Sequence, residues 1–203
     1  MNNVYDQLAS QEDLDVTVEA LSKNGFDVTV VETKEEAKQV VVGMVDKGAE
    51  VFTATSVTLD DTGIADVMNG DDYVSLRNKM NALWGQPDKK KEMMQIVASP
   101  DVVLGSVHAV TRDGKLMVAS NTGSQLPSEA YTASKVIYVV GSQKLVKDMA
   151  DGLQRIEEYT VPLEDVRAQA AYGVHTNFRK LLIFNNEVPG RVSVVIVKEN
   201  LGY

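Results

Sequence analysis

The side chains best suited to hold a small anion lie in short polar loops that follow apolar runs. Ser56 and Thr58 stand in the first of these loops, and the glycine turn that starts at Gly141 leads directly into Lys144. Hydroxyls and unpaired backbone N–H groups at a helix start attract anions, and an ammonium group adds opposite charge. These residues predict a binding site for a small anionic metabolite, without identifying a reaction.

Each of these residues also has a plain structural interpretation. Thr58 and Asp61 have the spacing of a capping box, so Thr58 can simply begin a helix. Lys144 can be an ordinary surface cation at the start of a helix that continues through Leu145 and Met149. A cation is mildly unfavourable at a helix start, and this conflict favours a functional interpretation of Lys144.

The stretch from Val102 to Lys147 contains three glycine-marked turns between apolar runs that are too short for helices. Asp113-Gly114 lies between two such runs and predicts a β-hairpin turn. The segment Asn121-Thr122-Gly123-Ser124 predicts a polar loop, and we take Asn121, Gly123 and Ser124 as further candidate ligand-binding residues.

The composition limits the chemistry that the chain can perform. Among its 203 residues there is no cysteine, which excludes disulfides, cysteine nucleophiles and self-ligated iron–sulfur clusters. His108 and His175 are the only imidazoles, which is too few for a multi-histidine metal site, and we expect both to be structural. We therefore predict no bound metal and no resident cofactor.

Charge and hydropathy argue against two classes of partner. The formal net charge of −9 opposes binding to nucleic acid, and Lys89-Lys90-Lys91 is predicted as the solvated first turn of a helix. No apolar run approaches the roughly 20 residues that a membrane helix needs. The N-terminus lacks the pattern of a secretory signal. The sequence thus predicts a cytoplasmic protein that binds neither nucleic acid nor membrane.

Strand and helix patterns alternate along the chain. Apolar spacing predicts a helix over Leu14–Lys23, a strand near 26–32, a helix capped by Thr33 and a strand near Val51–Thr53. The apolar run after Pro189-Gly190 predicts a final strand that is buried on both faces. This order predicts an α/β fold with a mostly parallel central sheet covered by helices, in which ligands collect at the carboxyl ends of strands.

We expect one domain over residues 1–203, with an N-terminal helical segment over 1–25 and a covering excursion over 66–100. Tyr73 and Trp84 of the excursion are expected in the core. The alternative is that they form a lid with Arg77, whose guanidinium can clamp a carboxylate. The parallel sheet further predicts one cleft, lined by Ser56, Thr58, Asn121, Ser124 and Lys144.

Four segments resemble, in order and spacing, the LUD-domain family, which includes lactate-utilisation protein C. They are ATSVTLDDTGI, VVLGSVHAVTRDGKL, VIYVVGSQKLVKDMADGLQRI and GRVSVVIVKENLG. The resemblance implies an α/β fold of the kind shared with ribose-5-phosphate isomerase, glucosamine-6-phosphate deaminase and coenzyme A transferases. It also implies a link to L-lactate oxidation, in which family members act with iron–sulfur partner subunits.

The resemblance carries a set of site positions with it. The matching positions are Ser56, Thr58, Gly105, Thr111, Gly114, Gly141 and Lys144. Two departures limit the transfer of function. This chain has Arg112-Asp113-Gly114-Lys115 where many relatives have a TGT-like triplet, and residues 172–184 lack the cysteines that many short relatives carry there. If those cysteines bind metal in the relatives, that function is missing here.

Three hypotheses about function follow. The first is an accessory subunit that binds a small carboxylate or phosphorylated metabolite in a lactate-oxidation assembly, which agrees with the lack of any GxGxxG or Walker pattern. The second is an isomerase or transferase acting on a sugar phosphate or acyl-coenzyme A, with Asp113 or Glu129 as general base and Lys144 stabilising negative charge. Asp113 is also explained as a turn residue, and Glu129 as a surface residue. The third is a homo-oligomeric assembly module.

Overall fold

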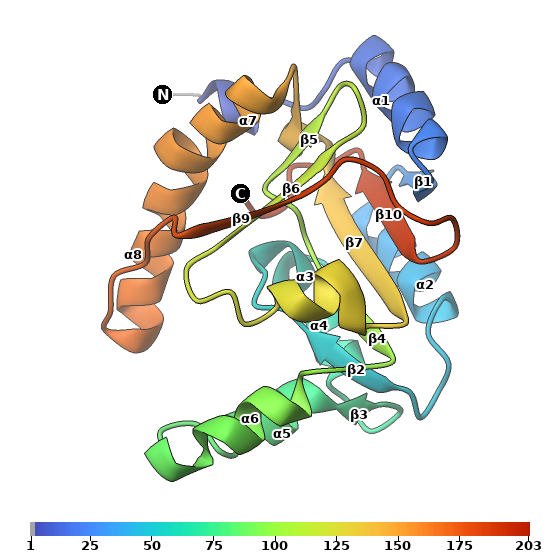
Figure 1. Ribbon diagram of the computed structural model, residues 1–203. Coiled ribbons are helices and arrows are strands. Elements are labelled where there is room, and N and C mark those ends of the chain that lie inside the picture. Colours follow the sequence, from blue (N-terminus) through green and yellow to red (C-terminus); the bar gives the residue numbers. More distant parts are fainter. Residues whose placement is uncertain (1–2) are drawn as a thin grey trace.

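A six-stranded parallel sheet forms the centre of the protein (Figure 1). In the computed structural model, which describes residues 3–203, the strand order is β1-β10-β7-β4-β2-β3, and every neighbouring pair is parallel. The strands are β1 (Asp27–Val31), β2 (Glu50–Thr53), β3 (Val74–Ser75), β4 (Val102–Gly105), β7 (Lys135–Gly141) and β10 (Val192–Val197). The predicted α/β fold with a parallel central sheet is confirmed.

The closing apolar run forms β10, at an interior position of this sheet. β10 pairs with β1 on one side and with β7 on the other, with Val192 opposite Val136 and Val197 opposite Gly141. All of its residues are buried. Elements cover both faces of the sheet, so a run of β-branched side chains packs there without an exposed side. The predicted strand buried on both faces is confirmed.

A second sheet of four strands packs beside the first, in the order β8-β5-β6-β9. β5 (Ala109–Thr111) and β6 (Leu116–Ser120) form the predicted antiparallel hairpin, flanked by β8 (Leu145–Val146) and β9 (Lys180–Phe184). Gly114 in the turn has a φ of +79°, and a Cβ there would lie 2.6 Å from the carbonyl carbon of Ala20. Both the backbone conformation and the close approach therefore require glycine.

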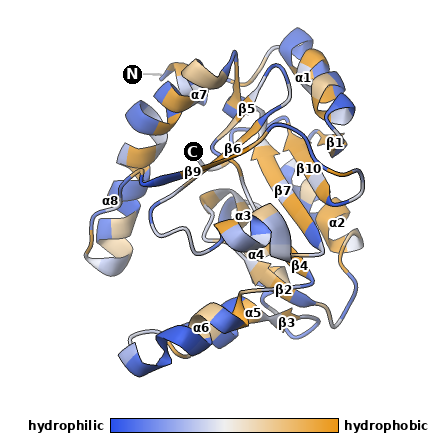
Figure 2. Ribbon diagram, viewed as in Figure 1, coloured by the Kyte–Doolittle hydropathy of each residue, from blue (hydrophilic) through white to orange (hydrophobic). Residues whose placement is uncertain are grey.

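Helices cover both faces of the larger sheet. On one face lie α2 (Lys34–Gly43), α3 (Val57–Asp61) and α4 (Ile64–Met68). On the other face lie α1 (Gln11–Lys23), α5 (Leu76–Asn81) and the second sheet. The outer side of the second sheet packs against α7 (Met149–Arg155) and the π-helical turn η5 (Ile156–Thr160), which continues into α8 (Val161–Tyr172). Figure 2 shows the hydrophobic strands β7 and β10 inside these layers.

Helix α2 begins as the sequence predicts, whereas α3 does not. The Thr33 hydroxyl accepts a hydrogen bond from the Glu36 N–H at 3.2 Å at the start of α2. At the start of α3, Ser56 accepts the Leu59 N–H at 3.3 Å. The prediction that Thr58 caps this helix is wrong, because Thr58 lies inside α3 with its side chain buried.

Residues 66–100 form the lower part of the molecule in Figure 1. They include α4, β3, α5, the 3-10 turn η2 (Pro87–Lys89) and α6 (Lys90–Ile96), so the three lysines stand at a helix start as predicted. Tyr73 is buried, but Trp84 is 66% exposed and lies beside Tyr172, with 6.5 Å between the ring centroids. The expectation that Trp84 lies in the core is wrong.

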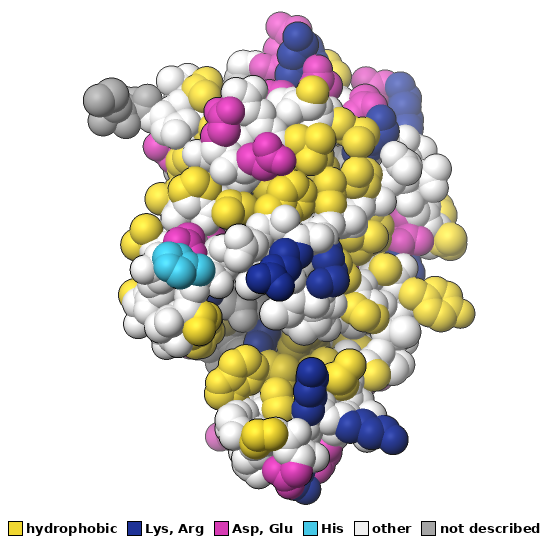
Figure 3. Space-filling view, turned by 60° about the vertical axis from the view of Figure 1, so that its left-hand side comes forward, with side chains coloured by type: hydrophobic (Ala, Val, Ile, Leu, Met, Phe, Trp, Pro, Cys, Tyr) yellow, Lys and Arg dark blue, Asp and Glu magenta, His cyan; other side chains and the backbone are white. Residues whose placement is uncertain are grey.

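Figure 3 shows that hydrophobic side chains reach the surface at several places on one face.

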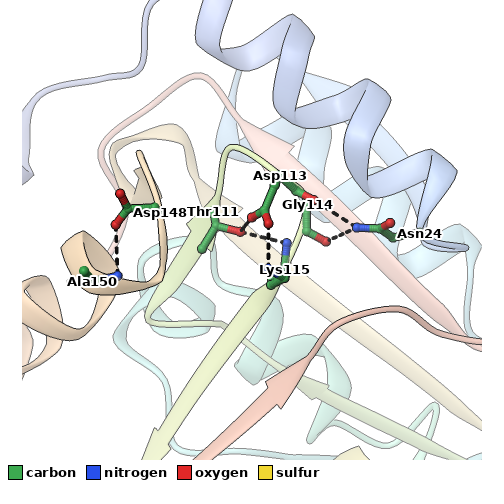
Figure 4. A network of polar contacts seen from close by, with 7 residues as sticks. All are labelled: Asn24, Thr111, Asp113, Gly114, Lys115, Asp148 and Ala150. Carbon is green, nitrogen blue, oxygen red and sulfur yellow. Dashed lines mark hydrogen bonds and ion pairs between the residues drawn. The ribbon is translucent and has the colours of Figure 1, made fainter.

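The chain around Lys144 differs from the predicted helix. Lys144 ends a short 3-10 turn, η4 (Ser142–Lys144), after which Leu145 and Val146 pair with β5 as the strand β8. Helix α7 starts only at Met149, where the Asp148 carboxylate accepts the Ala150 N–H at 2.9 Å (Figure 4). The pairing of β8 with β5 takes the place of the predicted first helical turn.

The N-terminal helical segment predicted over 1–25 corresponds to the 3-10 turn η1 (Val4–Asp6) and to α1, and its residues 1 and 2 lie outside the described residues. A π-helical turn, η3 (Ser128–Thr132), precedes β7. Within residues 3–203, every helix is too short or too polar to traverse a bilayer.

Candidate functional site

The loops after three neighbouring strands meet at the amino group of Lys144. Thr58 lies in α3, which follows β2; Ser106 follows β4; and Lys144 lies in the turn after β7. The Lys144 Nζ lies 2.8 Å from the Thr58 hydroxyl and 3.1 Å from the Ser106 hydroxyl. β4 lies between β2 and β7 in a parallel sheet, so the carboxyl ends of all three strands reach the same edge.

Lys144 is almost fully buried, with 2% of its surface exposed. The interpretation of Lys144 as a surface cation is therefore wrong. Its side chain bonds to hydroxyl groups, and no Asp or Glu of residues 3–203 forms an ion pair with it. Burial, reinforced by the nearby Arg155 guanidinium, holds the pKa of Lys144 well below its usual range, and Asp61 opposes this only in part.

The end of the chain closes over Thr58. The Thr58 hydroxyl donates to the Leu201 carbonyl at 3.2 Å, and the Gln143 side-chain amide donates to the same carbonyl at 2.9 Å. A Cβ at Gly141 would lie 2.9 Å from the Leu201 backbone nitrogen, so glycine is needed for this approach. Gly141, predicted as a ligand-binding residue, thus contributes by making room for residues 199–201.

His108 and Arg155 lie next to this cluster, where sequence reasoning did not place them. The His108 Nδ1 accepts the Ala119 N–H at 3.0 Å, which leaves the ring proton on Nε2. His108 is partly exposed as a residue, yet the protein around its ring desolvates the ring strongly, and with Lys144 and Arg155 this lowers the pKa of His108 to about 3. His108 is therefore a neutral donor, as a structural histidine would also be.

Arg155 is a buried guanidinium without an acidic partner. Its Nη1 donates to the His108 carbonyl at 2.6 Å and to the Thr160 hydroxyl at 3.0 Å. Its Nε and Nη2 have no hydrogen-bond partner among residues 3–203. The guanidinium carbon lies 5.2 Å from the ring centroid of Tyr159 and 5.9 Å from that of Tyr5, within the range of cation–π attraction. Burial lowers the pKa of Arg155 to about 10.

The loop after β6 begins near the His108 ring but bonds mainly within itself. The Gly123 N–H donates to the Ser120 hydroxyl at 2.8 Å, and the Ser124 N–H donates to the Thr122 hydroxyl at 3.3 Å. Lys180 donates to the Asn121 carbonyl at 3.4 Å. The placement of Asn121, Gly123 and Ser124 in one cleft with Lys144 remains a prediction.

The hairpin residues Thr111, Asp113 and Gly114 form a separate network (Figure 4). The Thr111 hydroxyl donates to the Asp113 carboxylate and accepts the Lys115 N–H at 2.9 Å, and Lys115 pairs with Asp113 at 2.6 Å. Asn24 at the end of α1 donates to the Asp113 and Gly114 carbonyls. The hydrogen bonds from Lys115 and Thr111 lower the pKa of Asp113. Among residues 3–203, no hydrogen bond or ion pair joins Asp113 to Lys144, and the role of Asp113 as a general base remains a prediction.

Glu129 is buried, and its interpretation as a surface residue is wrong. It lies in η3 with 1% of its surface exposed, and its Oε2 has no hydrogen-bond partner among residues 3–203. Burial raises the pKa of Glu129 to about 8, against the opposing effect of the nearby Tyr138 hydroxyl. A Cβ at Gly105 would lie 3.3 Å from the Glu129 Oε1, so Gly105 gives this carboxyl its space.

Arg77 and His175 lie apart from the Lys144 cluster. The Arg77 guanidinium lies over the Phe52 ring at 4.9 Å and donates to the Thr53 carbonyl, so it fastens the end of β2. His175 bonds to Asp165 at 2.9 Å near the end of α8. Across residues 3–203, no three His, Asp or Glu side chains are grouped as metal ligands would be.

The sequence model of the LUD domain family matches residues 14–197 of this chain. The chain belongs to the LUD-domain family. A crystal structure of a DUF162 family protein from Deinococcus radiodurans is similar to this LUD domain with a TM-score of 0.59 and 15% identity, over 94% of this chain and 99% of that chain. At this identity the similarity shows the fold alone. Among proteins with curated descriptions, none matches.

In this LUD domain, the structure brings two of the predicted residues, Thr58 and Lys144, into direct contact, with Ser56 at the start of the same helix. It adds Ser106, His108 and Arg155, which sequence reasoning missed as site residues. One signal for the first two was available in the sequence: Ser106 and His108 are polar residues on either side of Val107, directly after the glycine that ends β4.

Proposed function

We propose that this LUD domain binds a small anionic metabolite, a carboxylate in the first place, at the edge of the sheet around Lys144. The observation that supports this is the burial of two basic side chains, Lys144 and Arg155, without an acidic partner among residues 3–203. A buried charge without a counter-charge is costly, and a bound anion would supply the counter-charge. The helix start at Ser56 offers additional donors.

Anion binding at this edge is expected to be linked to proton uptake. Because the pKa of Lys144 is lowered in the free protein, a bound anion favours the ammonium form and raises that pKa. The affinity for the anion is therefore expected to fall as the pH rises. Titration calorimetry in two buffers of different ionisation enthalpy measures the number of protons taken up.

The chain is further proposed to be an accessory subunit in lactate oxidation. The segments that resemble lactate-utilisation protein C support this role, and the absence of cysteine means that redox groups would lie on iron–sulfur partner subunits. L-lactate and pyruvate are then the first ligands to test. Co-expression with iron–sulfur subunits is expected to give a stable complex, and a chain that purifies alone from that mixture contradicts the accessory role.

A thermal-shift titration with L-lactate, pyruvate, sugar phosphates and coenzyme A esters tests the site. A ligand bound only by the folded protein at 100 times its Kd stabilises it by about 2.7 kcal/mol. We expect a saturable shift that Lys144→Met abolishes and that Lys147→Met retains, since Lys147 is an exposed lysine three residues away. A shift of equal size in Lys144→Met, or no shift with any of these ligands, would contradict the proposal.

A further inference from the structure

The contact between Lys144 and Ser106 has the geometry of a nucleophile and its base. We infer that Ser106 and Lys144 form a serine–lysine pair that hydrolyses an ester or thioester of a small carboxylic acid. This inference rests on the proposed function, because the acid part of the substrate would occupy the same edge of the sheet. The Ser106 Oγ lies 3.1 Å from the Lys144 Nζ, within the range of a hydrogen bond between nucleophile and base.

The hydrogen bonds around Lys144 orient its amino group for this role. Thr58 donates its hydroxyl hydrogen to the Leu201 carbonyl, so its oxygen is left to accept an N–H of Lys144 at 2.8 Å. The lone pair of a neutral amine then remains for the Ser106 hydroxyl hydrogen. The competing acceptor of that hydrogen, the Val107 carbonyl, lies farther away at 3.3 Å. Thr58 is thus a positioning residue for the amine.

Burial supports the protonation state that a base requires. A lysine acts as a general base only as the neutral amine, and the desolvation of Lys144 together with Arg155 favours that form. The two partners also differ in access, as a nucleophile and its base should. Ser106 is partly exposed, as a residue that attacks a substrate must be, whereas Lys144 has only 2% of its surface exposed.

His108 supplies a donor for the charge that develops during acyl transfer. Ser106 and His108 are two residues apart and both are partly exposed, whereas Val107 between them is buried, which indicates that the two side chains face the same side of this segment. His108 is a partly exposed residue, and its ring carries its proton on Nε2, because Nδ1 accepts the Ala119 N–H. A neutral imidazole donates this hydrogen bond to an oxyanion without losing its proton.

The reaction proceeds in two balanced steps. The Ser106 oxygen attacks the acyl carbon while Lys144 takes the hydroxyl proton. The bond from carbon to the leaving sulfur or oxygen then breaks, and the Lys144 ammonium protonates the departing thiol or alcohol. In the second step water attacks the acyl-serine, Lys144 accepts a proton from the water, and it returns that proton to Ser106 as the carboxylic acid leaves.

The pair is tested with p-nitrophenyl acetate and acetyl-coenzyme A as probes. We expect p-nitrophenol or thiol release, with an acetyl group that mass spectrometry locates on the Ser106 peptide. Ser106→Ala and Lys144→Met are each expected to lower the rate by at least about 100-fold, whereas Ser22→Ala and Lys147→Met, at exposed positions, retain it. Circular dichroism and the thermal midpoint confirm that each variant folds.

The outcomes separate this inference from the proposed function. Ser106→Ala is expected to lose turnover while keeping the ligand-induced thermal shift, and Lys144→Met is expected to lose both. Three outcomes overturn the serine–lysine pair and leave anion binding intact. They are release of p-nitrophenol or thiol that persists in Ser106→Ala, an acetyl group on another residue, and no Ser106-dependent release from either probe. A thermal shift that persists in Lys144→Met overturns the anion site instead.

Discussion

Two polar networks, one around Asp113 and one around Lys144, differ in how their charges are balanced. In the hairpin turn, Asp113 is paired with Lys115 and bonded to Thr111, and the pair is partly exposed. At the sheet edge, Lys144 is buried among hydroxyl groups, and neither Lys144 nor the nearby Arg155 forms an ion pair with an acidic side chain of residues 3–203. A network in which every polar group has a partner stabilises a turn. A buried basic group without an acidic partner destabilises the fold, and such groups are found mainly where a ligand binds or a reaction takes place.

The largest stability effect is expected in the hairpin. Gly114→Ala forces a side chain onto a backbone with a φ of +79° and to within 2.6 Å of the Ala20 carbonyl carbon. We expect a loss of about 3 kcal/mol or more in the free energy of unfolding, measured by urea denaturation. Gly48→Ala is the matched control, because its φ is +82° but nothing lies within 4 Å of the added Cβ.

Gly48→Ala is expected to cost only about 1 kcal/mol, the strain of the backbone conformation without a clash. Equal losses in the free energy of unfolding for the two variants would mean that the contact between the hairpin and α1 does not contribute to stability. The ligand-induced thermal shift should survive in both variants, since neither glycine touches the Lys144 cluster.

The next effect in size concerns the buried acid Glu129. Its pKa is raised from 4.5 to about 8 in the folded protein, so between these values the folded state binds a proton that the unfolded chain has lost. The stability that Glu129 contributes is present below pH 4.5 and is lost as the pH rises through 8. A tenfold change in proton affinity corresponds to about 1.4 kcal/mol, so a loss of a few kcal/mol is expected by pH 9.

Glu129→Gln removes this titration while keeping the shape of the side chain. Urea denaturation at several pH values should show a smaller fall in stability between pH 5 and 9 than in the wild type. Parallel curves for the two proteins would contradict the raised pKa.

Lys144 is expected to show the opposite dependence on pH. Its folded pKa lies well below the ordinary 10.5, so between the two values the unfolded chain binds a proton that the folded protein does not. The stability of the wild type relative to Lys144→Met should therefore rise with pH up to about 10.5 and be lost as the pH falls. Near neutral pH we expect Lys144→Met to equal or exceed the wild type by about 1 kcal/mol, because methionine removes the cost of burying an amino group, which must otherwise give up its proton or keep its charge in the folded protein. A Lys144→Met variant that is less stable at every pH would contradict the lowered pKa of Lys144.

The contrast between the two networks also explains what the sequence predicts well. Strand β10 and the hairpin turn follow from local patterns, a β-branched run and an Asp-Gly pair, and both patterns can be recognised without knowing which distant residues they contact. The position of Lys144 depends instead on the pairing of β8 with β5, which interrupts the predicted helix and turns the lysine inward.

Local sequence patterns also do not predict the burial of side chains that join distant segments. Glu129 is expected on the surface from its sequence, and no local pattern marks Arg155 as buried, yet each is enclosed by segments far along the chain, as the contact between Arg155 and the His108 carbonyl shows. The pattern of polar loops after apolar runs identified the loops around Ser56 and Lys144, whereas the pairing of Ser106 with the lysine is given by the distance between their side chains.

The smallest effect is expected for Asp113→Asn. The carboxylate is exposed and paired with Lys115, and exposed ion pairs contribute about 1 kcal/mol or less. Asparagine keeps an oxygen that can accept the Thr111 hydrogen bond, so the hairpin should hold its conformation. Because the pKa of Asp113 is lowered, the small stability that it contributes should be present above pH 4 and lost as the pH falls below that value. We expect unchanged ligand-induced shifts and unchanged turnover of p-nitrophenyl acetate in this variant. A loss of turnover in Asp113→Asn would mean that the hairpin network, and not only the sheet edge, takes part in the chemistry.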